Sequence, residues 1–273
     1  MTSAGDCISF IIPTTKRNAE DIATLRSLVA YKLLNPNVEV IVSVDRWGSA
    51  ARARDEGARR SSCDILVFVD DDIEFNSRIL DHLISLVGRG YVVMLGGITL
   101  EGIPIALSRL TVTRRDAYVS SGGFDGRIIL NYHEDIDFAV SCIAKGYKIT
   151  LIPSGVVKHL EPPAKPKLHR LLRVRILNSF NRAMTLLKNP GIFLHTFTKY
   201  DRYRGLLKAM YVAWILLMPP LTHRVRSSRE GKMLALMVPI EIIARLSGLL
   251  YYSTILLLSS ISPLKLRKDQ PKA

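Results

Sequence analysis

The chain has three cysteines, one glutamine and few asparagines. Each of these low counts argues for or against a particular class of protein. Its three cysteines, Cys7, Cys63 and Cys142, lie far apart and lack metal-type spacing such as C-x-x-C, which argues against a cysteine-based metal site. We expect all three to be reduced residues of the core. A single glutamine and few asparagines are a feature of thermophilic proteins. The N-terminus lacks the basic and apolar segments of a signal peptide, so we expect the first part of the chain to stay in the cytosol.

Acidic residues are scarce in the second part of the chain. Residues 1–157 hold 17 Lys and Arg against 19 Asp and Glu, a net charge of −2, whereas residues 158–273 hold 21 against 5, a net charge of +16. The second part also holds the longest apolar runs, which a nucleic-acid-binding protein would rarely need. The positive charge therefore indicates an anionic membrane surface as the partner, and no nucleic acid. With 48% hydrophobic residues the chain can form a sizeable core, which excludes a disordered protein.

Short apolar runs alternate with helical patterns in the first part of the chain. The pattern predicts strands at 8–13, 38–44, 65–69, 91–95, 111–113 and 148–152, and helices at 21–34, 49–60 and 134–145. Buried strands separated by helices form an α/β fold with a mainly parallel sheet, in which ligands bind at the carboxyl ends of the strands. Those ends carry Pro13, Thr14, Asp45 and the acidic triplet Asp70–Asp72, so we expect a polar site there.

The second part of the chain has a different pattern of charged and apolar residues. A Pro-rich hinge at 161–166 precedes a basic amphipathic pattern at 168–187, which is typical of a helix in a membrane interface. Apolar runs follow at 206–221 and 233–262, and a spanning helix needs about 20 residues. Glu241 and Arg245, one helical turn apart in the second run, can neutralise each other.

These patterns predict three regions: an α/β domain at 1–160, a hinge with basic interfacial helices at 161–204, and a membrane domain at 205–273 with one or two transmembrane helices. A buried soluble hairpin is the alternative for the two apolar runs. Basic clusters flank both runs, as they flank membrane-spanning helices, but they do not fit two full crossings under the positive-inside rule. The number of crossings stays open.

Three adjacent carboxylates, Asp70, Asp71 and Asp72, directly follow the apolar strand at 65–69. They repel one another unless a cation lies among them, and hard oxygen ligands at a strand end suit Mg²⁺ or Mn²⁺. A solvated loop or a helix N-cap is the alternative for an isolated acidic triplet. Its position after a buried strand, in line with Asp45, favours the metal site.

A second acidic group follows a pair of glycines. Gly122-Gly123-Phe124-Asp125 is followed by His133-Glu134-Asp135-Ile136-Asp137-Phe138 at the start of the predicted helix at 134–145. Any one of these acids could be a helix-capping residue. Four acids within thirteen residues, after a flexible turn, instead indicate a pocket with a general base that accepts a proton from a hydroxyl group.

Together these motifs resemble the family-2 glycosyltransferases of GT-A fold. The similarity begins with ISFIIPTTKR at 8–17 and covers about the first 160 residues. The matching segments, in chain order, are Asp45, ARARDEG at 51–57, VDDD at 69–72, GGFD at 122–125, HEDIDF at 133–138 and GYKITLIPSGVVKH at 146–159. A single D-x-D motif is a weak signal, but this ordered set is specific.

The resemblance implies a nucleotide-sugar donor site at the strand ends. The residues implied for the nucleotide and its sugar are Pro13, Thr14, Asp45, Arg54, Asp70 and Asp71. Asp45 would contact the base or ribose, and Asp70 would face the ribose. Asp72 would ligate the Mn²⁺ or Mg²⁺ ion that bridges the donor's diphosphate. His159 matches a histidine that completes the metal or diphosphate site in some members, with an ordinary structural histidine as the alternative.

The resemblance also implies which residues act on the acceptor side of the site. Asp135, the last residue of the family's Glu-Asp pair, would be the catalytic base, and Glu134 and Asp137 would support it or orient the acceptor. Arg170 and Arg173 are similar to the Q/R-x-x-R-W motif of cellulose-synthase-like members, which contacts the donor diphosphate, although Val174 replaces the tryptophan. Contact with anionic lipid is the alternative role for these two arginines.

Taken together, the sequence predicts a membrane-attached, metal-dependent, inverting glycosyltransferase whose catalytic domain faces the cytoplasm. The favoured donor is GDP-mannose, by similarity to dolichyl-phosphate mannosyltransferases, and the favoured acceptor is a polyprenyl phosphate or lipid-linked glycan. The alternatives are a UDP-sugar-dependent glucosyltransferase, a processive polysaccharide synthase, or a non-catalytic nucleotide-binding membrane subunit. The presence of both Asp72 and Asp135 argues against the last, since a scaffold needs no base.

Overall fold

The structure is a computed structural model. It describes residues 7–46, 48–98, 104–127 and 133–160, together with helical pieces between residues 176 and 189 and between residues 240 and 254. The chain divides into two compact units, Met1–Pro166 and Lys167–Ala273. The predicted boundaries at residues 160 and 204 stay predictions.

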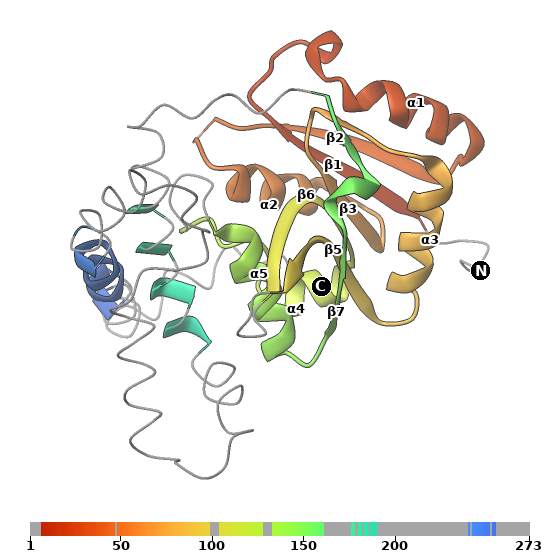
Figure 1. The fold of residues 1–273 in the computed structure, drawn as a ribbon. Coiled ribbons are helices and arrows are strands. Elements are labelled where there is room, and N and C mark those ends of the chain that lie inside the picture. The colour runs from red at the N-terminus through yellow and green to blue at the C-terminus, as the bar shows by residue number, and fades with distance from the viewer. Residues whose placement is uncertain are drawn as a thin grey trace, which may run out of the picture. The chain divides into compact units, whose positions relative to one another are not determined.

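A six-stranded sheet forms the centre of the first unit (Figure 1). Its strands, in spatial order, are β2 (Val38–Val44), β1 (Ile8–Thr14), β3 (Ile65–Val69), β6 (Pro104–Arg114), β5 (Tyr91–Ile98) and β7 (Lys148–Ile152). The pairs β1–β2, β1–β3 and β5–β7 are parallel, whereas β6 is antiparallel to both of its neighbours. The prediction of an α/β fold with a mainly parallel sheet is confirmed.

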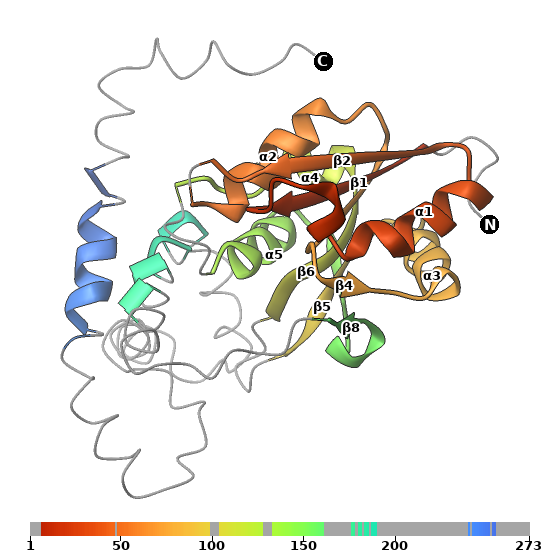
Figure 2. The ribbon, with the colours of Figure 1, turned by 90° about the horizontal axis from the view of Figure 1, so that it is seen from above.

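Helices cover both faces of this sheet (Figure 2). One face packs against α1 (Thr24–Leu34) and α3 (Ser77–Val87), and the other against α2 (Ala50–Arg60), α4 (Arg115–Ser120) and α5 (Glu134–Ala144). Successive strand residues alternate between the two cores: in β1, Phe10 and Ile12 belong to the first core and Ile11 to the second. The central strand β3, which is buried on both faces, is therefore apolar at every position.

Three features of the first unit differ from the sequence prediction. Strand β6 is much longer than the expected segment 111–113, and it runs against the rest of the sheet. Helix α3, absent from the prediction, begins after Asn76, whose side chain accepts a hydrogen bond from the amide of Arg78 at 2.9 Å. A short 3-10 turn, Ala19–Asp21, precedes α1, which begins three residues later than expected.

A second, two-stranded sheet lies beside the carboxyl end of β3. It pairs β4 (Ile73–Glu74) with β8 (Lys158–His159) in antiparallel register, so that Ile73 lies opposite His159. Strand β8 follows a second 3-10 turn, Ser154–Val156. This small sheet brings residue 159 next to the acidic triplet, although 87 positions separate Asp72 from His159 in the chain.

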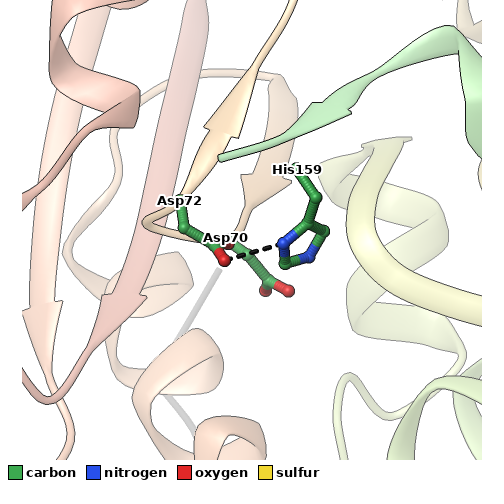
Figure 3. A group of neighbouring side chains, drawn as sticks. All are labelled: Asp70, Asp72 and His159. Atoms are coloured by element: carbon green, nitrogen blue, oxygen red, sulfur yellow. Dashed lines mark ion pairs between the residues drawn. The ribbon is translucent and has the colours of Figure 1, made fainter. Parts of the chain in front are cut away.

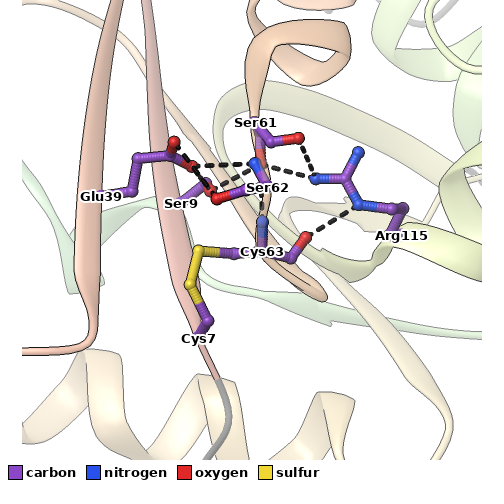
Figure 4. The surroundings of a disulfide bond; sticks show 7 residues. All are labelled: Cys7, Ser9, Glu39, Ser61, Ser62, Cys63 and Arg115. Atoms are coloured by element: carbon purple, nitrogen blue, oxygen red, sulfur yellow. Dashed lines mark hydrogen bonds between the residues drawn. A yellow bond between two sulfur atoms is a disulfide. The ribbon is translucent and has the colours of Figure 1, made fainter.

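A disulfide joins Cys7 and Cys63 at the amino end of the sheet (Figure 4). The prediction that all three cysteines are reduced is therefore wrong for this pair, whereas Cys142 is buried and lies outside the disulfide. Cys7 directly precedes β1 and Cys63 lies two residues before β3. Because these strands pair side by side, the two Cα atoms lie 4.8 Å apart despite a separation of 56 positions.

The guanidinium group of Arg115 organises the same end of the sheet (Figure 4). It donates hydrogen bonds to the carbonyl oxygens of Cys63 at 2.8 Å, Ala58 at 3.1 Å and Ser61 at 2.7 Å, and to Ser61 Oγ at 2.7 Å. Its partners belong to the last turn of α2 and the loop that follows. Arg115 therefore holds the connection between α2 and β3 through neutral oxygen atoms.

The second unit is described only in helical pieces. The ring of Phe180 packs on that of Tyr251 with centroids 5.5 Å apart, and a Cβ at Gly248 would lie 2.3 Å from the carbonyl oxygen of Phe180, so glycine permits a close approach of the two segments. Arg245 is buried, while its predicted partner Glu241, the run at 206–221, and Arg170 and Arg173 lie outside the described residues. Among the helices described, none is long and apolar enough to span a membrane.

Candidate active site

Asp70, Asp72 and His159 meet at the carboxyl end of β3 (Figure 3). One ligand atom from each residue lies within 4.8 Å of the other two, and Asp72 Oδ2 lies 2.8 Å from Nδ1 of His159. Asp72 is buried, with 7% of its surface exposed, whereas Asp70 and His159 are partly open to solvent. Two carboxylates and one imidazole are a donor set that fits Mn²⁺ or Mg²⁺.

The middle residue of the triplet, Asp71, has other partners. Its carboxylate accepts a hydrogen bond from the hydroxyl of Thr14 and lies 3.6 Å from Nζ of Lys16. Thr14 Oγ1 in turn accepts a hydrogen bond from the amide of Lys16 at 3.0 Å. Asp71 thus fixes the loop after β1, which leaves Asp70 and Asp72 to form the metal-type group with His159.

The ends of β1 and β2 lie side by side next to this group. Pro13 and Thr14 are buried at the end of β1, and the amide of Asp45, just after β2, donates a hydrogen bond to the carbonyl oxygen of Thr14 at 2.7 Å. The structure thus gathers three of the predicted nucleotide-site residues at adjacent strand ends. Lys16, which sequence reasoning missed, belongs to the same group and could have been found from its place two residues after Thr14.

Arg54 lies behind the acidic triplet and is almost completely buried, with 3% of its surface exposed. It donates hydrogen bonds to Asp70 Oδ1 at 3.0 Å and to Glu134 Oε1 at 3.1 Å. Burial by itself lowers the pKa of the guanidinium, but the charges of Asp70 and Glu134 outweigh this effect and raise the pKa above its usual value. Arg54 therefore stays charged between the two carboxylates.

Three acidic residues occupy the first turn of α5: Glu134, Asp135 and Asp137. Glu134 and Asp137 are buried, with 5% and 1% of their surfaces exposed, whereas Asp135 is half-buried and accepts a hydrogen bond from the amide of Ile136 at 2.8 Å. The helix dipole stabilises negative charge in this turn. Of the three, Asp135 is the carboxylate that solvent or an acceptor can reach.

The turn before α5 is built around Tyr118. Gly123 has φ of 64°, and a Cβ there would lie 2.9 Å from the tyrosine ring, so the motif needs a glycine at this position. The Tyr118 hydroxyl accepts a hydrogen bond from the amide of Phe124 at 3.3 Å and donates one to Asp55 Oδ1 at 3.2 Å. This packing places the Phe124 ring beneath Arg54, with 5.2 Å from the guanidinium carbon to the ring centroid.

Two further features of this region escaped the sequence analysis. Asp125 forms an ion pair with Arg127, at 2.6 Å and 2.8 Å from two guanidinium nitrogens, which fixes the end of the glycine turn. His133, directly before α5, has φ of 81°, a left-handed conformation that costs free energy in a residue with a side chain. No sequence pattern marks a strained histidine, whereas the spacing of Asp125 and Arg127 could have indicated their pairing.

Comparisons with known proteins identify a matching family model and a similar fold. Residues 9–139 match the family model of Glycosyl transferase family 2. A search of curated protein sequences finds no significant match. The chain is similar in structure to the mannosyltransferase PcManGT from Pyrobaculum calidifontis in complex with GDP-Man and Mn²⁺, with a TM-score of 0.52 and 15% identity over 91% of this chain and 88% of that chain.

Two other structures are similar at lower TM-scores. The structure of S. aureus TarS matches with a TM-score of 0.45 and 14% identity, over 96% of this chain and 93% of that chain. The catalytic domain of Drosophila β1,4-galactosyltransferase 7, in complex with xylobiose, matches with a TM-score of 0.44 and 16% identity, over 58% of this chain and 72% of that chain. At such identities only the first similarity, above a TM-score of 0.5, supports a shared fold. Residues 9–139 therefore match a glycosyl transferase family 2 domain, and the α/β fold that contains them is GT-A-like.

Proposed function

We propose that this glycosyltransferase moves mannose from GDP-mannose to a lipid-linked acceptor, such as a polyprenyl phosphate, with Mn²⁺ or Mg²⁺ as cofactor. The observation that carries the proposal is the group formed by Asp70, Asp72 and His159 at the carboxyl end of β3. The donor is proposed because a protein of similar fold was solved with GDP-Man and Mn²⁺.

On the donor side, Asp70, Asp72 and His159 would hold the cation. A divalent cation bound there would neutralise negative charge that develops on the diphosphate leaving group. Pro13, Thr14 and Asp45, at the neighbouring strand ends, would contact the nucleoside, with Asp45 as acceptor for the base or ribose hydroxyls. Asp71 would keep the loop after β1 in place through Thr14 and Lys16.

On the acceptor side, Asp135 would act as the base, because it is the most accessible of the three carboxylates in the first turn of α5. It would accept a proton from an acceptor hydroxyl, or orient an acceptor phosphate, which needs little proton removal. Glu134 and Asp137, both buried, would hold the start of the helix in position. Attack opposite to the leaving nucleoside diphosphate would invert the configuration at the sugar carbon in one displacement.

The lipid acceptor and the membrane location are proposed from the second part of the chain. Residues 158–273 carry a net charge of +16 and the longest apolar runs, which favours attachment to the cytoplasmic face of an anionic cell membrane. Arg170 and Arg173 would contact the donor diphosphate or lipid phosphates there. Such a location brings a lipid-linked acceptor within reach of the catalytic domain.

Sugar transfer by the full-length protein tests the proposal. Radiolabelled GDP-mannose, UDP-glucose and UDP-galactose are each offered with polyprenyl phosphate in vesicles, with Mn²⁺, with Mg²⁺ or with chelator. The expected result is metal-dependent transfer from GDP-mannose alone. Transfer from a UDP-sugar alone would overturn the choice of donor, and transfer to a soluble glycan but not to the lipid would overturn the acceptor. Full activity in chelator would overturn the metal site.

A further inference from the structure

Arg54 connects two parts of the site that come from distant segments of the chain. Its two terminal nitrogens donate to Asp70, at the end of β3, and to Glu134, at the start of α5. These carboxylates lie 64 positions apart in the sequence. The fork of the guanidinium therefore sets the position of one strand end relative to one helix start.

The surroundings of Arg54 do not match those of a purely stabilising ion pair. The guanidinium is 3% exposed, and its Nε atom has no hydrogen-bond partner among the residues that the structure describes. Removing charged groups from water is costly, and a buried ion pair often stabilises no more than an apolar replacement would. The remaining face packs on the Phe124 ring at 5.2 Å. The arrangement is better explained by the geometry that it imposes on the two carboxylates.

The two ends of this bridge have different tasks in the proposed function. Asp70 belongs to the metal-type group, and the hydrogen bond from Arg54 uses its Oδ1 atom, which fixes the direction of the carboxylate. Glu134 directly precedes Asp135, the proposed base, in the first turn of α5. One side chain thus holds both the donor side and the acceptor side of the site.

We propose that Arg54 is a positioning residue that orients Asp70 for the metal ion and, through the same guanidinium group, holds Glu134 and the start of α5. This inference rests on the proposed function in one respect: it takes Asp70 as a ligand of the donor's cation. The effect that it assigns to Arg54 acts through the two carboxylates and does not depend on a contact with the nucleotide. Partners that orient metal ligands typically contribute roughly 10- to 100-fold to metal affinity or activity.

Mn²⁺ binding to the full-length protein in the presence of GDP tests the inference without a turnover assay. The variants are Arg54→Lys, which keeps the charge but loses the fork, Glu134→Gln, and the double variant. Arg115→Lys is the matched control, because Arg115 also uses its fork to join two segments but contacts only neutral oxygen atoms. Calorimetry gives the Mn²⁺ affinity, and thermal unfolding shows whether each variant is folded.

The expected result is a 10- to 100-fold weaker Mn²⁺ affinity in Arg54→Lys. Glu134→Gln also weakens Mn²⁺ binding, because the released guanidinium no longer fixes Asp70, and the double variant binds no more weakly than Arg54→Lys alone. Arg115→Lys keeps the wild-type affinity. This non-additivity is a signature that a merely structural role of Arg54 would not produce.

Other outcomes would overturn the inference. Unchanged Mn²⁺ affinity in a folded Arg54→Lys variant, or additive effects of the two substitutions, would show that Arg54 does not orient Asp70. If Arg54→Lys fails to fold, unchanged affinity in Glu134→Gln overturns it equally. A wild-type protein that binds no Mn²⁺ with any nucleoside diphosphate would overturn the proposed function and this inference with it, whereas normal wild-type binding with insensitive variants overturns the inference alone.

Discussion

Arg54 and Arg115 lie at opposite ends of the central sheet and bind different kinds of partner. Arg115, at the amino end of β3, donates four hydrogen bonds to neutral oxygens of Ala58, Ser61 and Cys63, beside the disulfide. Arg54, at the carboxyl end, binds two carboxylates and leaves a buried Nε without a partner among the described residues. At the amino end of the sheet the arginine is fully hydrogen-bonded and lies beside a disulfide, whereas at the carboxyl end several carboxylates lie close together.

This difference indicates that the amino end of the sheet contributes mainly to stability and the carboxyl end mainly to activity. Buried polar groups that are fully hydrogen-bonded stabilise the fold, whereas crowded carboxylates repel one another until a ligand joins them. We therefore expect substitutions at the carboxyl end to change binding and catalysis, and substitutions at the amino end to change the free energy of unfolding alone.

The largest effect is expected for Asp72→Asn at the carboxyl end. Loss of one carboxylate from the group with Asp70 and His159 should lower the transfer rate roughly a thousandfold, since a cation contributes several kcal/mol to a charged transition state. Initial rates across a Mn²⁺ titration measure this. Asp64→Asn is the matched control, because Asp64 lies at the amino end of the same strand and is exposed. A variant of Asp72 with wild-type rates would contradict the metal assignment.

Asp135→Asn should lower the transfer rate by about a hundredfold or more while donor affinity stays unchanged, because a general base acts on the acceptor only. Rates with a hydroxyl acceptor and donor binding by calorimetry are measured together. A variant that transfers sugar at a near-normal rate would show that Asp135 is not the base.

At the amino end, Cys63→Ser should lower the free energy of unfolding by about 2–4 kcal/mol, because the disulfide to Cys7 closes a long loop in the unfolded chain. Donor binding and transfer should stay unchanged. Denaturant unfolding of the variant, compared with wild type with and without reductant, measures the effect. Equal stability of oxidised and reduced wild type would contradict the crosslink.

Arg115→Met should destabilise the fold by about 2 kcal/mol, because it leaves carbonyl oxygens of the loop after α2 without their donor. The Mn²⁺ dependence of transfer should not change. Thermal unfolding and a metal titration on the same sample separate the two effects. A changed metal affinity in this variant would remove the distinction between the two ends of the sheet.

The smallest effect concerns Glu39, which accepts hydrogen bonds from Ser9 Oγ and the amide of Ser62. Burial tends to raise the pKa of Glu39, but these hydrogen bonds outweigh it and lower the pKa below its usual value. Its contribution to stability is present above the usual glutamate pKa and is lost as the pH falls through the lowered value. Glu39→Gln should therefore be slightly less stable at pH 7 and equal to wild type in strong acid; a pH-independent difference would exclude this linkage.

The sequence predicted most of the sheet because buried parallel strands are local, continuous apolar runs. The bounds of β2, β3 and β7 were predicted as observed, and α2 and α5 to within a residue. The missed features depend on distant partners. The direction of β6 is set by pairing with β3 and β5, and the disulfide by the adjacency of β1 and β3, so neither leaves a local pattern.

The sequence predicted which residues form the candidate site, but it predicted only part of the contacts between them. The acidic triplet was expected to act together, whereas the Asp71 carboxylate contacts Thr14 and Lys16. Its side chain points away from the group that Asp70 and Asp72 form with His159. Arg54 was expected in the nucleotide pocket, and its burial between Asp70 and Glu134 follows from packing against Phe124, which sequence spacing does not encode. Its nucleotide contact stays a prediction.

Calorimetric titration of GDP-mannose into the full-length protein, with Mn²⁺ and with chelator, tests the central claim most directly. The proposal predicts binding that requires Mn²⁺, that is lost in Asp72→Asn and that persists in Asp64→Asn. Donor binding of equal strength with and without the metal, and in both variants, would contradict a metal-dependent donor site at the carboxyl end of β3.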